Sequence, residues 1–227
     1  MLALLYDVHG NLAALEAVLD DARADTFVLG GDYGLFGPWP VETVERLHGL
    51  PNAVWIRGNV DRWTAHPGDA PDDALIRDAI ADCSEALGTA VVDELDGLAE
   101  QLVVDGVRYC HASPLSDLRS FMPSATAEED ELLDGASEQR IVFGHTHLQF
   151  KRGTATGAEL INPGSVGMPF DGDPRAAYAL LHDDGRIELR RVAYDHEASG
   201  TAVAERFAGA AWAARSARRL RTATMCD

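Results

Sequence analysis

The amino-acid sequence predicts an α/β protein with mixed sheets, on three observations. Short apolar runs end directly at polar residues, as buried strands do when they deliver side chains from their carboxyl ends. An amphipathic helical pattern follows the first run. The pairs Asp105-Gly106 and Asp184-Gly185 each separate two strand-like runs, which indicates tight hairpins. Helix-linked strands and antiparallel hairpins together predict two sheets packed face to face.

The predicted elements begin with these apolar runs. We expect strands at residues 2–6, 26–29, 53–56 and 141–143, each followed by residues that can bind metals. After the first strand, Asn11 can cap a helix. The apolar residues of that helix recur at spacings of three and four, at Leu12, Leu15, Val18 and Leu19. The chain therefore predicts a βα unit at its start.

Two further segments complete the predicted single domain, which spans residues 1–227. Residues 62–98 predict a helical insert, which would either flank the mouth of a site or pack as a plain helix pair. Residues 201–220 predict an alanine-rich C-terminal helix. Its last turns carry Arg215, Arg218, Arg219 and Arg221, where cations complement the helix dipole. This pattern favours packing or homo-oligomer contacts over nucleic-acid contacts.

Composition limits the class of protein. With 227 residues and 46% hydrophobic content the chain can form one substantial core. The formal net charge is −18, and Lys151 is the sole lysine among 19 basic residues. Long nucleic acid is excluded as a partner, because its binding depends on Lys and Arg neutralising phosphates.

Cysteine usage and hydropathy predict a cytoplasmic protein outside the membrane. The three cysteines, Cys83, Cys110 and Cys226, are widely spaced and odd in number, which argues against a disulfide framework. The N-terminal apolar run has no basic flank and stops at Asp7, so it does not resemble a signal sequence. No apolar stretch approaches the roughly 20 residues that a membrane span requires.

Metal-binding side chains follow strand-like runs at five places. These residues are Asp7 and His9, Asp32, Asn59, His111, and His145 and His147. Oxygen ligands mixed with imidazole suit Mn, Fe, Ni, Co or Zn. Alternate spacing would place each Asp-x-His or His-x-His pair on one side of an extended segment. Each block alone has a structural interpretation as a cap, a turn or a packed histidine, and only the ordered set indicates a metal site.

The ordered blocks Asp7-Val8-His9, Gly31-Asp32, Gly58-Asn59, His111 and Gly144-His145-Thr146-His147 resemble those of the calcineurin-like metallophosphoesterases, in particular the small single-domain prokaryotic branch. The resemblance runs from Leu2 through an Asn-Pro-Gly-Ser-Val-Gly turn at 162–167 to about Val192. It implies a four-layer α/β/β/α sandwich of two mixed sheets flanked by helices.

The resemblance also implies a role for each block. Two divalent or trivalent transition-metal ions would bind, with Mn favoured. Asp7, His9, Asp32 and His147 would hold one ion, and Asp32, Asn59, His111 and His145 the other. A hydroxide between the ions would attack phosphorus, with Asp32, Asn59 and His111 in the catalytic machinery. No covalent enzyme intermediate is needed.

The sequence indicates substrate-binding residues less specifically than metal ligands. Arg57, Arg62 and Arg175, with Asn59, could orient a phosphate, since guanidinium matches phosphate geometry, although each arginine could instead form a surface ion pair. Val60 stands where many relatives have a histidine that protonates the leaving group. The resemblance implies a phosphodiesterase acting on a small phosphodiester or nucleotide.

Other functions remain open on the sequence alone. The chain could be a phosphomonoesterase, a phosphoprotein phosphatase, or a weak or inactive metal-binding scaffold that resembles a retromer subunit. A scaffold has no need of seven ligand side chains, whereas this chain keeps all seven.

Overall fold

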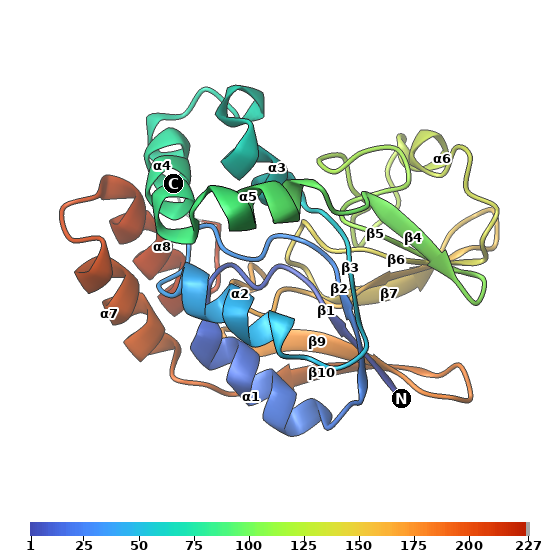
Figure 1. Cartoon of the computed structure of the whole chain (residues 1–227). Helices are drawn as coiled ribbons and strands as arrows, with labels where there is room; N and C mark the ends of the chain where they lie inside the picture. The colour runs from blue at the N-terminus through green and yellow to red at the C-terminus, as the bar shows by residue number, and fades with distance from the viewer. Residues whose placement is uncertain (226–227) are drawn as a thin grey trace.

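The structure is a computed structural model that describes residues 1–225, and Cys226 lies outside the described residues (Figure 1). Within these residues two five-stranded sheets stack face to face, in the orders β10-β9-β1-β2-β3 and β4-β5-β6-β8-β7. Helices flank the sheets, so the predicted arrangement of two mixed sheets between helices is confirmed.

The first sheet combines parallel and antiparallel strands. β1, β2 and β3 run parallel, β9 pairs antiparallel with β1, and β10 pairs antiparallel with β9. The predicted hairpin at Asp184-Gly185 is confirmed as the β9–β10 connection. The strands are β1 (Leu2–Leu5), β2 (Thr26–Leu29), β3 (Ala53–Trp55), β9 (Ala176–Leu181) and β10 (Ile187–Val192).

The second sheet repeats this organisation. β5, β6 and β8 run parallel, with β4 and β7 antiparallel at the two edges. The hairpin predicted at Asp105-Gly106 is confirmed between β4 and β5. The strands are β4 (Gln101–Val104), β5 (Val107–Cys110), β6 (Arg140–Val142), β7 (Phe150–Gly153) and β8 (Glu159–Asn162).

The apolar run of β1 reflects burial on both faces. Ala3 and Leu5 pack toward the helices α1 (Leu12–Ala22) and α2 (Pro40–His48), whereas Leu4 and Tyr6 pack into the space between the sheets. A strand covered on both faces has no polar face, so its sequence is continuous rather than alternating. Asn11 caps α1 as predicted, by accepting a hydrogen bond from the backbone N–H of Ala14 (3.3 Å).

The predicted insert region is helical. It begins within α3 (Asn59–Ala65) and continues through the short 3₁₀ helix η1 (Pro67–Asp69), α4 (Ala74–Leu87) and α5 (Thr89–Asp96). In Figure 1 these helices lie above α2, and α4 packs against α8. One further short helix, α6 (Glu129–Leu132), packs on the outer face of the second sheet through Leu132, which joins Phe121 and Phe143 in a buried cluster.

The C-terminal segment differs from its prediction. The single helix expected over residues 201–220 is two helices, α7 (His196–Arg206) and α8 (Ala211–Thr222). The break falls at Gly209, whose φ of 91° lies in the left-handed region that no α-helix contains. The Trp212 indole donates to Asp82 Oδ2 of α4 (2.7 Å), which docks α8 onto the insert.

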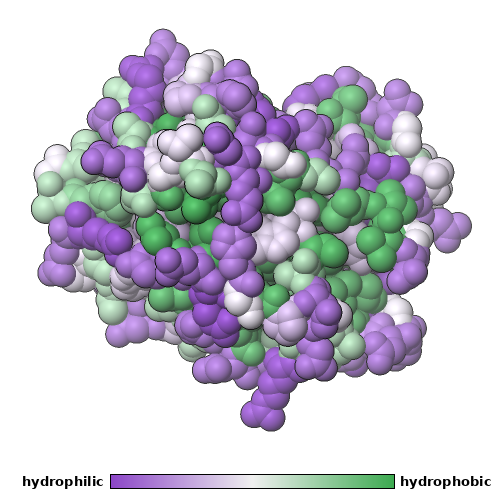
Figure 2. All heavy atoms as spheres, viewed as in Figure 1, coloured by the Kyte–Doolittle hydropathy of each residue, from purple (hydrophilic) through white to green (hydrophobic). Residues whose placement is uncertain are grey.

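Hydrophilic residues cover most of the face of the molecule shown in Figure 2, with apolar residues in smaller patches between them.

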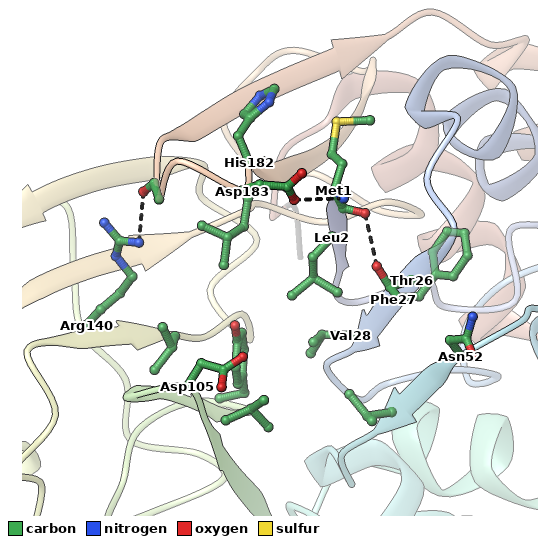
Figure 3. A pocket seen from close by; sticks show the side chains of 16 residues that line it. Met1, Leu2, Thr26, Phe27, Val28, Asn52, Asp105, Arg140, His182 and Asp183 are labelled. Carbon is green, nitrogen blue, oxygen red and sulfur yellow. Dashed lines mark hydrogen bonds and ion pairs between the residues drawn. The ribbon is translucent and has the colours of Figure 1, made fainter.

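A cavity of about 590 Å³ opens between the sheets at the end where the parallel strands begin. Leu2, Val28 and Arg140 are among the residues that line it (Figure 3). Among residues 1–225 no helix combines the length and apolarity needed to cross a bilayer.

Candidate metal centre

The predicted metal-binding side chains lie where parallel strands of both sheets end. They follow β1 (Asp7 and His9), β2 (Asp32), β3 (Asn59), β5 (His111) and β6 (His145 and His147). All are buried except His145, which is half-buried. Strands that run parallel in two stacked sheets end at one common edge, so residues far apart in the chain meet there.

The backbone that presents these side chains is not extended, which corrects the expectation for the Asp-x-His and His-x-His pairs. Five of the seven candidates have positive φ: Asp7 (54°), His9 (47°), Asp32 (62°), His145 (65°) and His147 (58°). This conformation costs a non-glycine residue roughly 1–2 kcal/mol. The side chains converge because the loops turn sharply, and the surrounding structure has to hold that strain.

The turn at residues 162–167 supports the loop after β1, which carries Asp7 and His9. Ser165 Oγ and the Gly167 N–H both donate to the carbonyl of Asp7 (2.7 and 3.0 Å). A Cβ on Gly167 would lie 1.8 Å from the carbonyl oxygen of Val8, so only glycine fits. The Asn11 amide in turn donates to the Gly167 carbonyl (2.8 Å). The turn therefore supports the loop that carries Asp7 and His9.

Asp61 holds the loops after β2 and β3 together. Its Oδ2 accepts hydrogen bonds from the N–H groups of Asp32 and Gly58 (2.8 Å each), and its Oδ1 accepts from that of Tyr33 (3.1 Å). Burial, and then the charge of Asp32, raise the pKa of Asp61 to about 6. Asp61 therefore acts on the site by positioning the neighbouring loops.

Three histidines share one tautomer. Nδ1 of His9 faces the Leu35 carbonyl (2.9 Å), Nδ1 of His111 faces the Gly30 carbonyl (2.8 Å), and Nδ1 of His147 faces the Met168 carbonyl. A carbonyl oxygen only accepts, so each Nδ1 carries a hydrogen and each Nε2 is directed into the site. The Nε2 lone pair is free at His9 and His147, whose pKa burial lowers, whereas Nε2 of His111 keeps a proton that a metal would displace. This is the arrangement that backbone carbonyls impose on metal-binding histidines.

The candidate ligand atoms form two triads. Ligand atoms of Asp7, His9 and His147 lie within 4.8 Å of one another, as do those of Asp32, His111 and His145.

Asp32 joins these triads. Its Oδ2 is 3.7 Å from His9 Nε2 of the first triad and 3.4 Å from His111 Nε2 of the second. Asn59 Oδ1 adds a fourth ligand atom to the second triad, 2.9 Å from His111 Nε2 and 2.8 Å from His145 Nδ1.

The electrostatics of the first triad fit a cation. Asp7 Oδ1 is buried with no hydrogen-bond partner among residues 1–225. Burial raises the pKa of Asp7 and lowers the pKa of His9 and of His147. The Nε2 atoms of the two histidines nevertheless face each other at 3.1 Å. Two unprotonated nitrogens and an unpartnered carboxylate oxygen repel one another unless a positive ion lies among them.

The second triad has mixed charge. His111 is buried, which disfavours its charged form, yet the carboxylate of Asp32 raises its pKa to about 10. Its contact with His111 correspondingly lowers the pKa of Asp32 against the effect of burial. Burial lowers the pKa of His145 to about 4. A metal ion at this triad would therefore displace one proton, from His111.

The arginines predicted to bind substrate are paired elsewhere. Arg57 donates to Asp96 and Glu100, and the exposed Arg175 pairs with Asp173. Arg62 forms a bidentate pair with Asp117 and also contacts Asp69. Of the three, Arg62 alone lines a cavity beside a candidate ligand, together with His111.

A cavity of about 310 Å³ opens over the triads and brings in residues that the sequence pattern did not indicate. His9, Asp32, Asn59, His145 and His147 line it, together with Val60. The unexpected lining residues include Phe36, Trp63 and Phe170 from the loops and α3, and Arg215 and Arg219 from α8. The spacing of four between the two arginines places them on one helix face, which was the available signal.

The comparisons with known proteins decide the family. A model described as the calcineurin-like phosphoesterase superfamily domain matches residues 1–186. The chain belongs to the calcineurin-like phosphoesterase superfamily. Members of this superfamily are phosphoesterase hydrolases that use divalent metals.

Relatives of this superfamily member extend the match toward its C-terminus. An uncharacterized protein of Methanocaldococcus jannaschii is 30% identical over an alignment of 223 positions that covers 86% of this chain and 88% of the relative. A metallophosphoesterase structure from Sphaerobacter thermophilus is 26% identical, with a TM-score of 0.82 over 98% of each chain. A hypothetical protein of Pyrococcus horikoshii shares the fold, at 18% identity and a TM-score of 0.86 over 100% of both chains.

Replacing Asp7 by Asn should stabilise the metal-free protein. Because burial raises the pKa of Asp7 in the folded state, ionisation at neutral pH, above the unfolded pKa of about 3.9, destabilises that state. The amide carries no charge and its NH₂ can donate to the facing ring nitrogens. The melting temperature of the metal-free variant should exceed that of the metal-free parent, by about 2–4 °C per kcal/mol gained. Added Mn should raise it less than it raises the parent's.

Asp61→Asn is the matched control, because Asp61 is also buried with a raised pKa. There the NH₂ group would face backbone N–H donors, so this variant should lose about 1–3 kcal/mol. A metal-free Asp7→Asn protein that melts below the parent would contradict the account.

Proposed function

We propose that this chain is a dinuclear metal-dependent phosphodiesterase that hydrolyses a small phosphodiester or nucleotide. The observation that carries the proposal is the unpartnered, buried Oδ1 of Asp7 beside the facing Nε2 atoms of His9 and His147. A folded protein keeps such an arrangement where a cation satisfies it. Membership in a superfamily of phosphoesterases supplies the reaction class.

Each candidate ligand takes a role in this proposal. Asp7, His9, Asp32 and His147 hold one ion, and Asp32, Asn59, His111 and His145 hold the other. Mn is the favoured ion, with Fe, Ni, Co or Zn as alternatives that the same ligands accept. When bound, the ions supply positive charge to the phosphate and activate water as the nucleophile. Asp32 would be shared by the two sites, since its Oδ2 lies near ligand atoms of both triads, whereas Asn59 lies between His111 and His145 of one site.

The completeness of the ligand set favours an enzyme over a scaffold. All seven side chains converge, and backbone carbonyls fix the tautomer of three histidines. A protein that served only as a scaffold would gain nothing from this order.

Val60 cannot donate a proton, which favours esters whose leaving group departs without one, such as an aryloxide, over esters that must expel an alkoxide. The buried free thiols Cys83 and Cys110 agree with a reducing, cytoplasmic location. The net charge of −18 disfavours long nucleic acid as the substrate.

Metal removal tests the proposal directly. A chelator should abolish phosphodiester hydrolysis, and added Mn or a similar ion should restore it. Asp32→Ala should remove both turnover and at least one ion per chain, because Asp32 Oδ2 stands between ligands of both triads. Metal analysis and hydrolysis of an aryl phosphodiester measure the two effects separately.

Asp72→Ala is the control for this experiment, since the side chain of Asp72 is 98% exposed and lies in no triad. The proposal fails if the Asp32→Ala protein keeps its metal content and its rate.

The leaving group provides a second test. Val60 lines the cavity and is 3% exposed, but its side chain cannot donate a proton. General acid catalysis contributes typically about 10² to 10⁴ in rate. We expect fast cleavage of aryl phosphodiesters, which leave without a proton, and slow cleavage of alkyl phosphomonoesters. Val60→His should accelerate the poor leaving groups most, whereas Val60→Ala should not.

The dependence of rate on leaving-group pKa measures this effect where chemistry limits turnover. A parent enzyme whose rate hardly varies with leaving-group pKa would show that another acid already protonates the leaving oxygen.

A further inference from the structure

The cavity over the candidate metal centre has walls that hydrolysis itself does not require. Apolar side chains from separate parts of the chain form them: Phe36, Trp63, Ile76, Met168 and Phe170. Three of the five are aromatic. The cavity volume of about 310 Å³ is at the small end for ligand pockets, which suits one arm of a small ester.

A cation lies beside these walls. The ring of Phe170 stacks on that of His147, with centroids 4.3 Å apart and planes at 13°. The guanidinium carbon of Arg219 is 5.7 Å from the Phe170 centroid, within cation–π range. One aromatic ring therefore connects Arg219 to a candidate metal ligand. After burial and other neighbours, the charge of Arg219 also contributes to the lowered pKa of His9.

Arg215, the second arginine of α8 that lines the cavity, forms an ion pair with the insert. Arg215 Nη1 donates to Asp73 Oδ2 (3.1 Å), and Asp73 caps the N-terminus of α4. This ion pair, together with the bond from Trp212 to Asp82, attaches α8 to the insert. The attachment fixes the helix that carries Arg219 against the mouth of the cavity.

We propose that this cavity binds the non-leaving arm of the substrate, that this arm is an aromatic ring, and that Arg219 contacts an oxygen of the phosphate. The inference rests on the proposed phosphodiesterase function and adds the substrate class. Aromatic walls favour a flat ring over a sugar or an alkyl chain. A guanidinium matches the geometry of phosphate oxygens, and α8 brings it to the site that Arg57 and Arg175 do not reach.

Equilibrium binding of two phosphonates to the Mn-loaded protein tests the proposal without turnover. Phenylphosphonate carries the ring, and methylphosphonate carries the same anionic group without it. Calorimetry should show phenylphosphonate binding at least about tenfold more tightly. Equal affinities would overturn the aromatic arm, and failure of both probes to bind would overturn the whole inference.

Two pairs of variants locate the contacts. Arg219→Gln should weaken both phosphonates by about tenfold or more, because a charge-assisted hydrogen bond is lost. Arg218→Gln is its control, since Arg218 is exposed on the same helix and does not line the cavity. If both variants lost the same affinity, the effect of Arg219 would come from its charge in general, and the proposed contact with the phosphate would be wrong.

Ile76→Ala should reduce the ratio of phenyl to methyl affinity severalfold, because Ile76 forms part of the wall. Leu75→Ala, which removes a half-buried neighbour on the same helix that does not line the cavity, should leave the ratio unchanged. Metal content, measured on every variant, separates loss of substrate contact from loss of the ions.

A hydrolysis assay separates failure of the proposed phosphodiesterase function from failure of the proposed aromatic arm. Ring preference without phosphodiester hydrolysis would contradict the proposed function and leave an aromatic anion site. Hydrolysis without ring preference would contradict this inference alone.

Discussion

The convergence of unprotonated ligand atoms in a buried space is the constraint on which the rest of the structure depends. Asp7 Oδ1 has no hydrogen-bond partner among residues 1–225, and the Nε2 atoms of His9 and His147 face each other at 3.1 Å. Left alone, these atoms repel one another in surroundings of low polarity. The backbone at five candidate ligands is strained into the left-handed region to bring them together. Hydrogen bonds from the turn at 162–167, where Gly167 has no room for a Cβ, and backbone carbonyls that face the histidine rings hold the ligands in place. Such strain persists mainly at functional sites.

The two sheets depend on one another through this site. Each triad takes residues from both: Asp7 and His9 follow β1 whereas His147 follows β6, and Asp32 follows β2 whereas His111 follows β5. A bound ion would thus cross-link the edges of the two sheets. Metal binding and the stability of the sandwich should be coupled, because an ion that binds only the folded state stabilises that state.

The sequence predicts the centre of this protein better than its periphery. β1, β2 and β6 are continuous apolar runs that ligands follow directly, so these strands and their ligands were predicted. β7 and β8 were not predicted. β7 is an edge strand of partly exposed residues that include Lys151 and Arg152, and the buried β8 is followed by a turn and not by metal ligands. The left-handed loops were missed because residue spacing carries no information on φ. The spacing of Arg215 and Arg219 places them on one helix face, but it does not indicate which surface that face meets, because Arg219 reaches the cavity through tertiary docking of α8.

Anomalous diffraction from crystals grown with Mn tests the central claim most directly. The account predicts two peaks per chain, one among Asp7, His9 and His147 and the other among Asp32, His111 and His145, with Asp32 contacting both. A single peak, or ions bound only at surface carboxylates, would contradict it.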